Sequence, residues 1–172
     1  MSEVFVIADL HFGHKKLAEV RGFESTQAHD DDIVDRWNRA VRKRDVTYVL
    51  GDVFKLDRMK DLNGLKKLAM GNHDTMPIAR YAEHFSKVAA YFDFDGALLS
   101  HIPVHEGQFG RWDVNVHGHL HSNILDDLRY LCVSVEHVKA PHRLRDLLRD
   151  RRHLLTRLAT PTISIPRGQS QL

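Results

Sequence analysis

The sequence predicts an α/β protein whose strands form layered, mixed sheets. Over the first 85 residues, short apolar runs alternate with segments of helical periodicity, and this alternation indicates parallel βαβ units. Beyond that point strands predominate, joined by short or hairpin connections that add further strand pairs. With 172 residues, 42% of them hydrophobic, the chain can bury a substantial core. We expect one domain over residues 1–158, followed by a C-terminal tail at 159–172.

The first half of the chain alternates strands with helices. Three runs are short and apolar, as buried parallel strands are. Between the first two runs, Ile33, Val34 and Trp37 recur at helical spacing. They follow aspartates at 30–32, which suit a first helical turn because the helix dipole favours negative charge there. The expected elements are strands at 4–8, 46–50 and 65–70 and helices at 29–42, 55–63 and 77–85.

The second half contains more strands than helices. The dipeptide Asp95-Gly96 lies within the run 87–99 and predicts two strands joined as a β-hairpin. Leucines recur at helical spacing over 142–158, so this segment predicts a helix with one apolar stripe. The other expected strands lie at 113–117 and 130–135.

Composition excludes several classes of protein. The single cysteine, Cys132, rules out an intramolecular disulfide and a zinc–thiolate site. No apolar run reaches the roughly 18 residues that a transmembrane helix needs. The N-terminus lacks the basic start and apolar core of a signal peptide. We therefore expect a soluble, cytoplasmic protein without a membrane partner.

Charge is unevenly distributed along the chain. The overall net charge is +2, but residues 141–172 contain seven arginines and only two acidic residues. A basic helix in this segment could bind nucleic acid, whereas a solvated helix face is the commoner reason for such a run of charge.

Potential metal ligands follow five of the expected strands within a few residues. Because the carboxyl ends of parallel strands meet at one edge of a sheet, these residues should lie together where open α/β sheets bind ligands. Glycines at 51, 71 and 118 directly precede three of them and allow the backbone to approach another group closely. The candidates are Asp9, His11, Asp52, Asn72, His73, His101, His119 and His121.

The spacing and chemistry of these residues point to metal ions. In Asp9-x-His11 and His119-x-His121, residues i and i+2 of an extended segment point the same way, so each pair can approach a metal from one side. Imidazole, carboxylate and amide oxygen donors together suit Mn, Fe, Co, Ni or Zn. The donors exceed what one four-coordinate ion needs, so two ions bridged by a carboxylate would use them all.

The candidate ligands and the residues beside them form short sequence motifs. The order of these motifs along the chain resembles that of the calcineurin-like metallophosphoesterase superfamily. The compact length resembles small prokaryotic or phage-type members without a cap domain. The resemblance implies a four-layer αββα sandwich with two mixed β-sheets. It also implies two divalent metal ions per chain, with manganese as the expected metal and Ni, Fe, Co or Zn as alternatives. The matching blocks are Asp9-Leu10-His11, Gly51-Asp52, Gly71-Asn72-His73-Asp74, His101 and Gly118-His119-Leu120-His121.

The resemblance further implies a role for each of these residues. His73 would be the catalytic histidine, close to the leaving-group oxygen, and Asp52 would bridge the two metals. The ligands of one metal would be Asp9, His11, Asp52 and His121. The ligands of the other would be Asp52, Asn72, His101 and His119.

One position departs from the family pattern. Many members carry a second aspartate three residues after the first, where it supports the catalytic histidine, but this chain has Lys55 there. Asp74 or a water molecule would then orient His73. Two further residues are candidates for substrate contacts, namely His14 beside the first block and Arg111 in a glycine-flanked loop. Helix capping and loop packing are the alternative roles of these two residues.

The implied activity is hydrolysis of phosphoesters by a hydroxide activated between two metal ions. A small chain without a cap leaves an open cleft, which favours a phosphodiesterase acting on a nucleotide or related small diester. The alternatives are a phosphomonoesterase or protein phosphatase, a nuclease that uses the basic C-terminal helix, and a non-catalytic scaffold of the same fold. The sequence assigns no oligomeric state.

Overall fold

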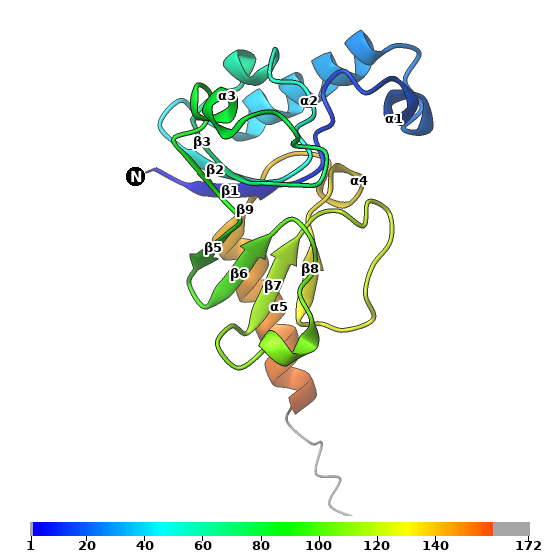
Figure 1. Ribbon diagram of the computed structural model, residues 1–172. Coiled ribbons are helices and arrows are strands. Elements are labelled where there is room, and N and C mark those ends of the chain that lie inside the picture. The colour runs from blue at the N-terminus through cyan, green and yellow to red at the C-terminus, as the bar shows by residue number, and fades with distance from the viewer. Residues whose placement is uncertain (1, 160–172) are drawn as a thin grey trace, which may run out of the picture.

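Two mixed β-sheets lie at the centre of the protein (Figure 1). The computed structural model describes residues 2–159. The strands of the first sheet are β1 (Val4–Ile7), β2 (Val46–Leu50), β3 (Leu65–Ala69), β4 (Lys87–Ala89) and β9 (His142–Arg143). Their order is β4-β3-β2-β1-β9, and every neighbouring pair is parallel except β1 with β9. The parallel pairing brings the carboxyl ends of β1, β2 and β3 to one edge.

The middle of the chain builds the second sheet. Its strands are β5 (Tyr91–Phe94), β6 (Ala97–Ser100), β7 (Val114–His117) and β8 (Tyr130–Cys132). The order is β5-β6-β7-β8, with β5 and β6 antiparallel and the other neighbours parallel. The expected α/β class with two mixed sheets is confirmed, as is the hairpin around Asp95-Gly96.

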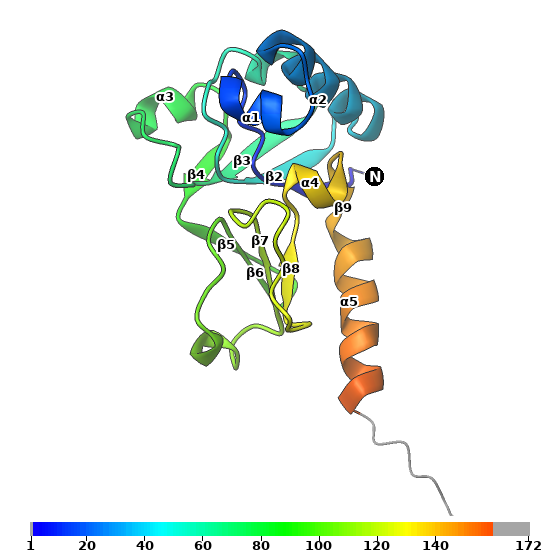
Figure 2. The ribbon, with the colours of Figure 1, turned by 90° about the vertical axis from the view of Figure 1, so that its right-hand side faces the viewer.

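Helices cover both sheets. They are α1 (Lys15–Val20), α2 (Thr26–Ala40), α3 (Ile78–Ala82), α4 (Val135–Val138) and α5 (Leu144–Ala159), with 3-10 turns η1 (Met59–Asp61) and η2 (Glu106–Gln108). In Figure 1, α1, α2 and α3 lie above the first sheet, on the side away from the second sheet. Figure 2 shows α5 running beside the second sheet. The succession of helices, first sheet, second sheet and α5 agrees with the expected four layers.

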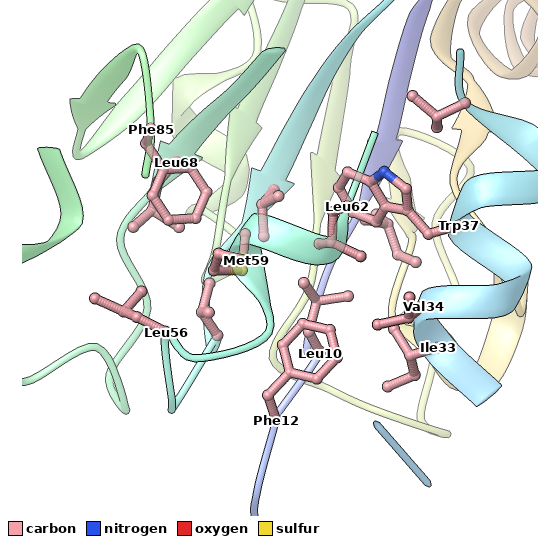
Figure 3. Close-up of a cluster of buried hydrophobic side chains, with 14 of the residues drawn as sticks. Leu10, Phe12, Ile33, Val34, Trp37, Leu56, Met59, Leu62, Leu68 and Phe85 are labelled. Atoms are coloured by element: carbon pink, nitrogen blue, oxygen red, sulfur yellow. The ribbon is translucent and has the colours of Figure 1, made fainter. Parts of the chain in front are cut away.

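A hydrophobic cluster fills the space between the first sheet and its helices (Figure 3). Leu10 and Phe12 are fully buried in it and lie beside Trp37 of α2 and the segment around η1. Burial of a large apolar side chain contributes about 1.5–3 kcal/mol, so the loop after β1 is firmly anchored. The alternating residues Asp9 and His11 are thereby held at the edge of the sheet.

A second cluster joins the two sheets and α5. Val6 and Leu50 of the first sheet are fully buried against Leu99 and Val116 of the second, and Leu148 of α5 packs into the same cluster. A parallel bridge between Ala8 and Ser134 continues the contact beyond the strand ends. The loops that follow the strands of both sheets therefore meet along one seam.

Several element boundaries differ from the sequence expectations. The chain changes sheets at Ala90, between β4 and β5, although no turn residue marks that point. The expected helix at 55–63 is only the short turn η1. Helix α2 begins three residues early because the Ser25 hydroxyl accepts a hydrogen bond from the Ala28 backbone amide. Helices α1 and α4 have no counterpart in the sequence prediction.

The expected tail begins inside α5, which reaches Ala159. Residues 160–172 lie outside the described residues, so the division into a domain and a tail stays a prediction. No helix between residues 2 and 159 is long and apolar enough to cross a bilayer.

Candidate metal centre

The residues predicted at the strand ends meet at the seam between the sheets. Asp9, Asp52 and Asn72 follow β1, β2 and β3 of the first sheet. His101 and His119 follow β6 and β7 of the second. The backbone amide of Ala8 donates to the carbonyl of Val133 at 2.9 Å, which fixes the two sheets together at this point.

Asp9, His11 and His121 form the first group of potential ligands. Their ligand atoms all lie within 4.8 Å of one another. Neither ring nitrogen of the buried His11 has a hydrogen-bond partner among the described residues, and a bound metal would remove the cost of this arrangement. Burial lowers the pKa of His11 to about 2. Its imidazole is therefore neutral and carries the lone pair that a metal ligand requires.

Asp9 is held by residues from the other sheet. Its Oδ2 accepts hydrogen bonds from the Ser134 hydroxyl at 2.5 Å and from the His119 backbone amide at 3.0 Å. Complete burial raises the pKa of Asp9 to about 6. A neighbouring cation favours the ionised form of a carboxyl group, so the position suits metal binding.

Asn72, His101 and His119 form the second group. The side-chain oxygen of Asn72 lies 2.9 Å from Nε2 of His101 and 3.0 Å from Nδ1 of His119. The two nitrogens are 3.2 Å apart. His101 Nδ1 donates to the Leu50 carbonyl at 2.9 Å, so its other ring nitrogen, Nε2, is the one that faces Asn72 and His119.

The geometry of this second group suits a cation. With the His101 proton on Nδ1, Nε2 of His101 and the Asn72 side-chain oxygen can each offer a lone pair to a shared ion. Two ligands bound about 2.1 Å from one ion at right angles lie about 3 Å apart. The spacing of the three donor atoms is therefore that of ligands around a shared ion.

Asp52 lies between the two groups. Its Oδ2 is 3.4 Å from Nε2 of His11, and its Oδ1 is 3.4 Å from Nε2 of His101. Oδ1 also accepts a hydrogen bond from the His73 backbone amide at 2.9 Å. Asp9 provides another link, because it also gathers with Asp52 and His101. The Asp52 carboxylate faces one histidine of each group, which is the position a bridging ligand needs.

The loops carrying these residues have an unusual backbone. Left-handed φ values occur at Asp9 (60°), His11 (50°), Asp52 (53°), Phe54 (70°), His119 (69°) and His121 (51°). Each such residue costs of order 1–3 kcal/mol, and they gather at functional sites. The sequence pattern predicts extended pairs, but neither pair is extended. Asp9 and His11 still converge on one group, whereas His119 and His121 turn to different groups.

Glycines allow the loops to approach closely, as predicted. A Cβ atom at Gly118 would lie 2.5 Å from Ala8 Cβ and 2.7 Å from Asp9 Oδ2. Gly51 has a φ of +80°, and a Cβ there would strike the His101 ring. A side chain at either position would displace a ligand candidate.

Comparison with known proteins agrees with this geometry. A family model described as calcineurin-like phosphoesterase matches residues 3–166. The chain belongs to the calcineurin-like phosphoesterase family. Membership implies metal-dependent hydrolysis of phosphoesters, and the family generally uses a binuclear centre of divalent ions.

Relatives of this phosphoesterase occur in phages and archaea. The Gene 66 protein of Mycobacterium phage L5 is 31% identical over 166 aligned residues, which cover 73% of this chain and 80% of that protein. The uncharacterized protein MJ1445 of Methanocaldococcus jannaschii is 29% identical over 143 residues, covering 76% of each chain. The crystal structure of the protein of unknown function AQ665 from Aquifex aeolicus shares the fold. Its TM-score is 0.67 at 23% identity, covering 87% of this chain and 99% of that one.

His73 of the phosphoesterase lies beside the first group with its side chain exposed. Its ring packs edge-on against His11, with centroids 5.2 Å apart, and lies 6.1 Å from the ring of His14 and 6.4 Å from that of Phe54. His14 also caps α1 by accepting a hydrogen bond from the Leu17 amide at 3.2 Å. The structure thus brings His14 next to the catalytic candidate, and capping is its observed contact.

Asp74 does not orient the His73 imidazole. Its two oxygens accept hydrogen bonds from the backbone amides of Asp52, Val53 and Gly71 at 3.0, 2.9 and 2.8 Å. No hydrogen bond joins it to the His73 ring within the described chain, and Lys55 lies against Gly13. The observed contacts of Asp74 hold two ligand loops together, and its expected catalytic role stays a prediction.

Arg111 lies at the end of the second sheet opposite the metal ligands. Because β6 and β7 are parallel, the chain that leaves β6 at His101 must return to the amino end of β7. Arg111 precedes β7, whereas His119 follows it. Its exposed guanidinium lies 5.1 Å from the Trp112 ring centroid. The observed contact of Arg111 is loop packing, and its contact with substrate stays a prediction.

Two charged residues that the sequence pattern does not indicate lie behind the first group. Glu136 accepts a hydrogen bond from His121 Nδ1 at 3.0 Å, and Arg21 contacts Glu136 at 2.9 Å. Although burial raises the pKa of Glu136, the bond to His121 and the charge of Arg21 lower it to about 2. Glu136 directly follows the expected strand 130–135. Its position is therefore like that of the ligand candidates, which also follow strands, and this could have indicated it. Arg21 ends α1 and carries no comparable signal.

Proposed function

We propose that the protein is a bimetallic phosphodiesterase that acts on a nucleotide or a related small diester. The observation that carries the proposal is the convergence of two donor groups on one carboxylate, Asp52, directly beside the exposed His73. The first group would hold one ion and the second group the other. Manganese is the proposed metal, and it is one of the ions, with Fe, Co, Ni and Zn, that suit imidazole, carboxylate and amide oxygen donors together.

When bound, two divalent ions would supply an activated water and neutralise charge on the phosphoryl oxygens. His73 would donate a proton to the leaving-group oxygen, a role that requires an accessible imidazole close to the metal ligands. The exposed side chain and the 5.2 Å ring separation from His11 support this role. The backbone amide of His73 is fixed to Asp52, so the donor keeps its position relative to both groups.

The surroundings of His73 favour a diester over a monoester. The side chains of Asn72 and His73 are exposed, so both ester groups of a diester can extend from the site. His14 and Phe54, with ring centroids 4.8 Å apart and ring planes inclined at 52°, form an aromatic wall beside His73. Such a wall suits a planar leaving group such as a nucleoside or an aryl alcohol.

A nuclease that binds DNA through α5 is the weaker alternative. Arg149 pairs with aspartates of α5 itself, while Arg152 pairs with Asp95 and Asp113 near the amino end of β7. These arginines have carboxylate partners and lie at the sheet end opposite His119. These ion pairs favour a solvated helix face over a DNA-binding surface.

Hydrolysis of a substrate panel tests the proposal. Bis-p-nitrophenyl phosphate, p-nitrophenyl phosphate, cyclic nucleotides and single-stranded DNA are each assayed with Mn²⁺ and Ni²⁺. We expect diesters to give the highest kcat/KM with Mn²⁺, and we expect two metal ions per chain by elemental analysis. Preference for the monoester would overturn the diester assignment, and salt-sensitive hydrolysis of DNA would favour the nuclease. Inactivity with every substrate and metal would identify a scaffold.

A further inference from the structure

All three guanidinium nitrogens of Arg21 have partners. Nη2 donates to the Asp9 carbonyl at 2.8 Å and contacts Glu136 Oε1 at 2.9 Å, and Nε donates to the same Glu136 oxygen at 3.0 Å. Nη1 reaches the Leu10 carbonyl at 3.3 Å and His29 Nε2 at 2.9 Å. The side chain is only 7% exposed. Partners on all three nitrogens of a planar guanidinium indicate one fixed geometry.

One side of this network holds the loop after β1. His29 is fully buried, and its Nδ1 lies 2.8 Å from Asp30 Oδ1, so its Nε2 can accept the bond from Arg21. The Asp30 carboxylate accepts the backbone amide of Gly13 at 2.9 and 3.1 Å. The loop that carries Asp9 and His11 is therefore fixed at its beginning by Arg21 and at its end by Asp30.

The other side of the network holds His121. Nδ1 of this histidine lies 3.0 Å from Glu136 Oε1. When Nδ1 carries the proton and donates to the carboxylate, Nε2 keeps its lone pair for a metal. His121 follows β7 of the second sheet, whereas Asp9 and His11 follow β1 of the first. Arg21 and Glu136 thus connect the two halves of the first ligand group across the seam.

We propose that Arg21 and Glu136 are positioning residues that set the affinity of the first metal site. The inference rests on the proposed function, because it takes Asp9, His11 and His121 as metal ligands. The pair holds two loops of left-handed backbone in the geometry that the ion requires, so the ion need not order them on binding. Hydrogen-bond partners of metal ligands typically contribute about 10–100-fold to metal affinity.

Two conservative substitutions test the pair. Arg21→Lys keeps the charge and removes the planar fork, and Glu136→Gln keeps the shape and removes the charge. Matched controls are Arg36→Lys and Glu83→Gln, because both residues form partly or largely exposed ion pairs within one helical segment. Mn²⁺ is titrated into chelator-stripped protein by calorimetry, and electron paramagnetic resonance monitors the coupled pair of Mn²⁺ ions.

We expect each test variant to weaken one of two Mn²⁺ binding steps by about 10–100-fold and to lose the coupled signal at low Mn²⁺. The controls should bind both ions as the wild type does. Asn72→Ala should weaken the other step. The double variant should lose little more than either single one, because the two residues act as a unit. Thermal unfolding of metal-free protein shows whether each variant is folded. If Arg21→Lys does not fold, Glu136→Gln still tests the positioning role of the pair.

The two proposals fail in different ways. If the wild-type protein binds no pair of Mn²⁺ ions, both the proposed function and the positioning role of Arg21 and Glu136 are overturned. If folded test variants bind both ions with wild-type affinity, only the positioning role is overturned.

Discussion

Asp74 accepts a hydrogen bond from the backbone amide of Asp52 at 3.0 Å. The Asp74 carboxylate, next to His73 in the sequence, therefore binds the backbone of a ligand loop rather than the His73 imidazole. Because Asp74 also binds the amides of Val53 and Gly71, it joins the loops after β2 and β3. The same carboxylate thus sets the separation of Asp52 and Asn72.

Asp74→Asn should destabilise the protein by about 1–3 kcal/mol, because the amide group leaves a buried backbone N–H without an acceptor. Urea unfolding of metal-free protein measures this loss, with Asp57→Asn at an exposed neighbouring position as the control. Metal affinity should fall as well. Unchanged stability would show that the three hydrogen bonds do not hold the loops.

His73→Ala should lower kcat by about 10²–10⁴-fold while both metals remain bound. The loss should be larger for an alkyl leaving group than for p-nitrophenolate, because a poor leaving group depends more on protonation. Steady-state rates with the two kinds of diester measure this difference, and His153→Ala on the exposed side of α5 is the control. Wild-type rates at full metal content would remove His73 from the mechanism.

Asp52→Ala should bind no tight pair of metals, because its carboxylate faces His11 and His101 at 3.4 Å each. Elemental analysis after dialysis should give at most one ion per chain and activity should be lost. Asp52→Asn keeps one oxygen and the hydrogen bond from the His73 amide, so it separates bridging from loop support. Two tightly bound ions in either variant would contradict the bridging role.

Asp45 should stabilise the fold in a pH-dependent way. The backbone amides of Glu3 and Arg42 donate to its carboxylate at 2.9 and 2.8 Å, and these bonds lower its pKa. A lowered folded-state pKa stabilises the protein above the unfolded value of about 4, and this stabilisation is lost as the pH falls through the folded value.

Asp45→Asn should therefore cost about 1–3 kcal/mol at neutral pH. The difference from wild type should narrow below about pH 4. Urea unfolding at a series of pH values measures both quantities. A difference that stays constant down to pH 3 would show that ionisation of Asp45 does not contribute.

The sequence predicts the strands, and which polar residues gather at the strand ends, because both depend on local signals. Apolar runs mark β1, β2 and β3. A polar residue directly after such a run lies at the carboxyl end of the strand. The change of sheet at Ala90 is invisible, because no turn residue accompanies it. The position of Arg111 before β7 is also hidden, because the direction of the connection to β7 depends on strand pairing, which the local pattern does not contain.

The supporting residues are harder to predict for a related reason. Arg21 acts through Glu136, which is 115 positions away in the chain, and only the pairing of the two sheets brings them together. The role of Asp74 also escapes, since its motif places it beside His73 while its side chain turns toward the backbone of another loop. Such partners become visible only in three dimensions.

The ligand groups span the seam, and this has a mechanical consequence. Each group contains donors from both sheets, so an ion bound in either group would cross-link the two sheets. Sliding of one sheet over the other would pull Asn72 away from His101 and Asp9 away from His121. Metal binding, and the hydrolysis that needs it, should therefore depend on how the two sheets are aligned.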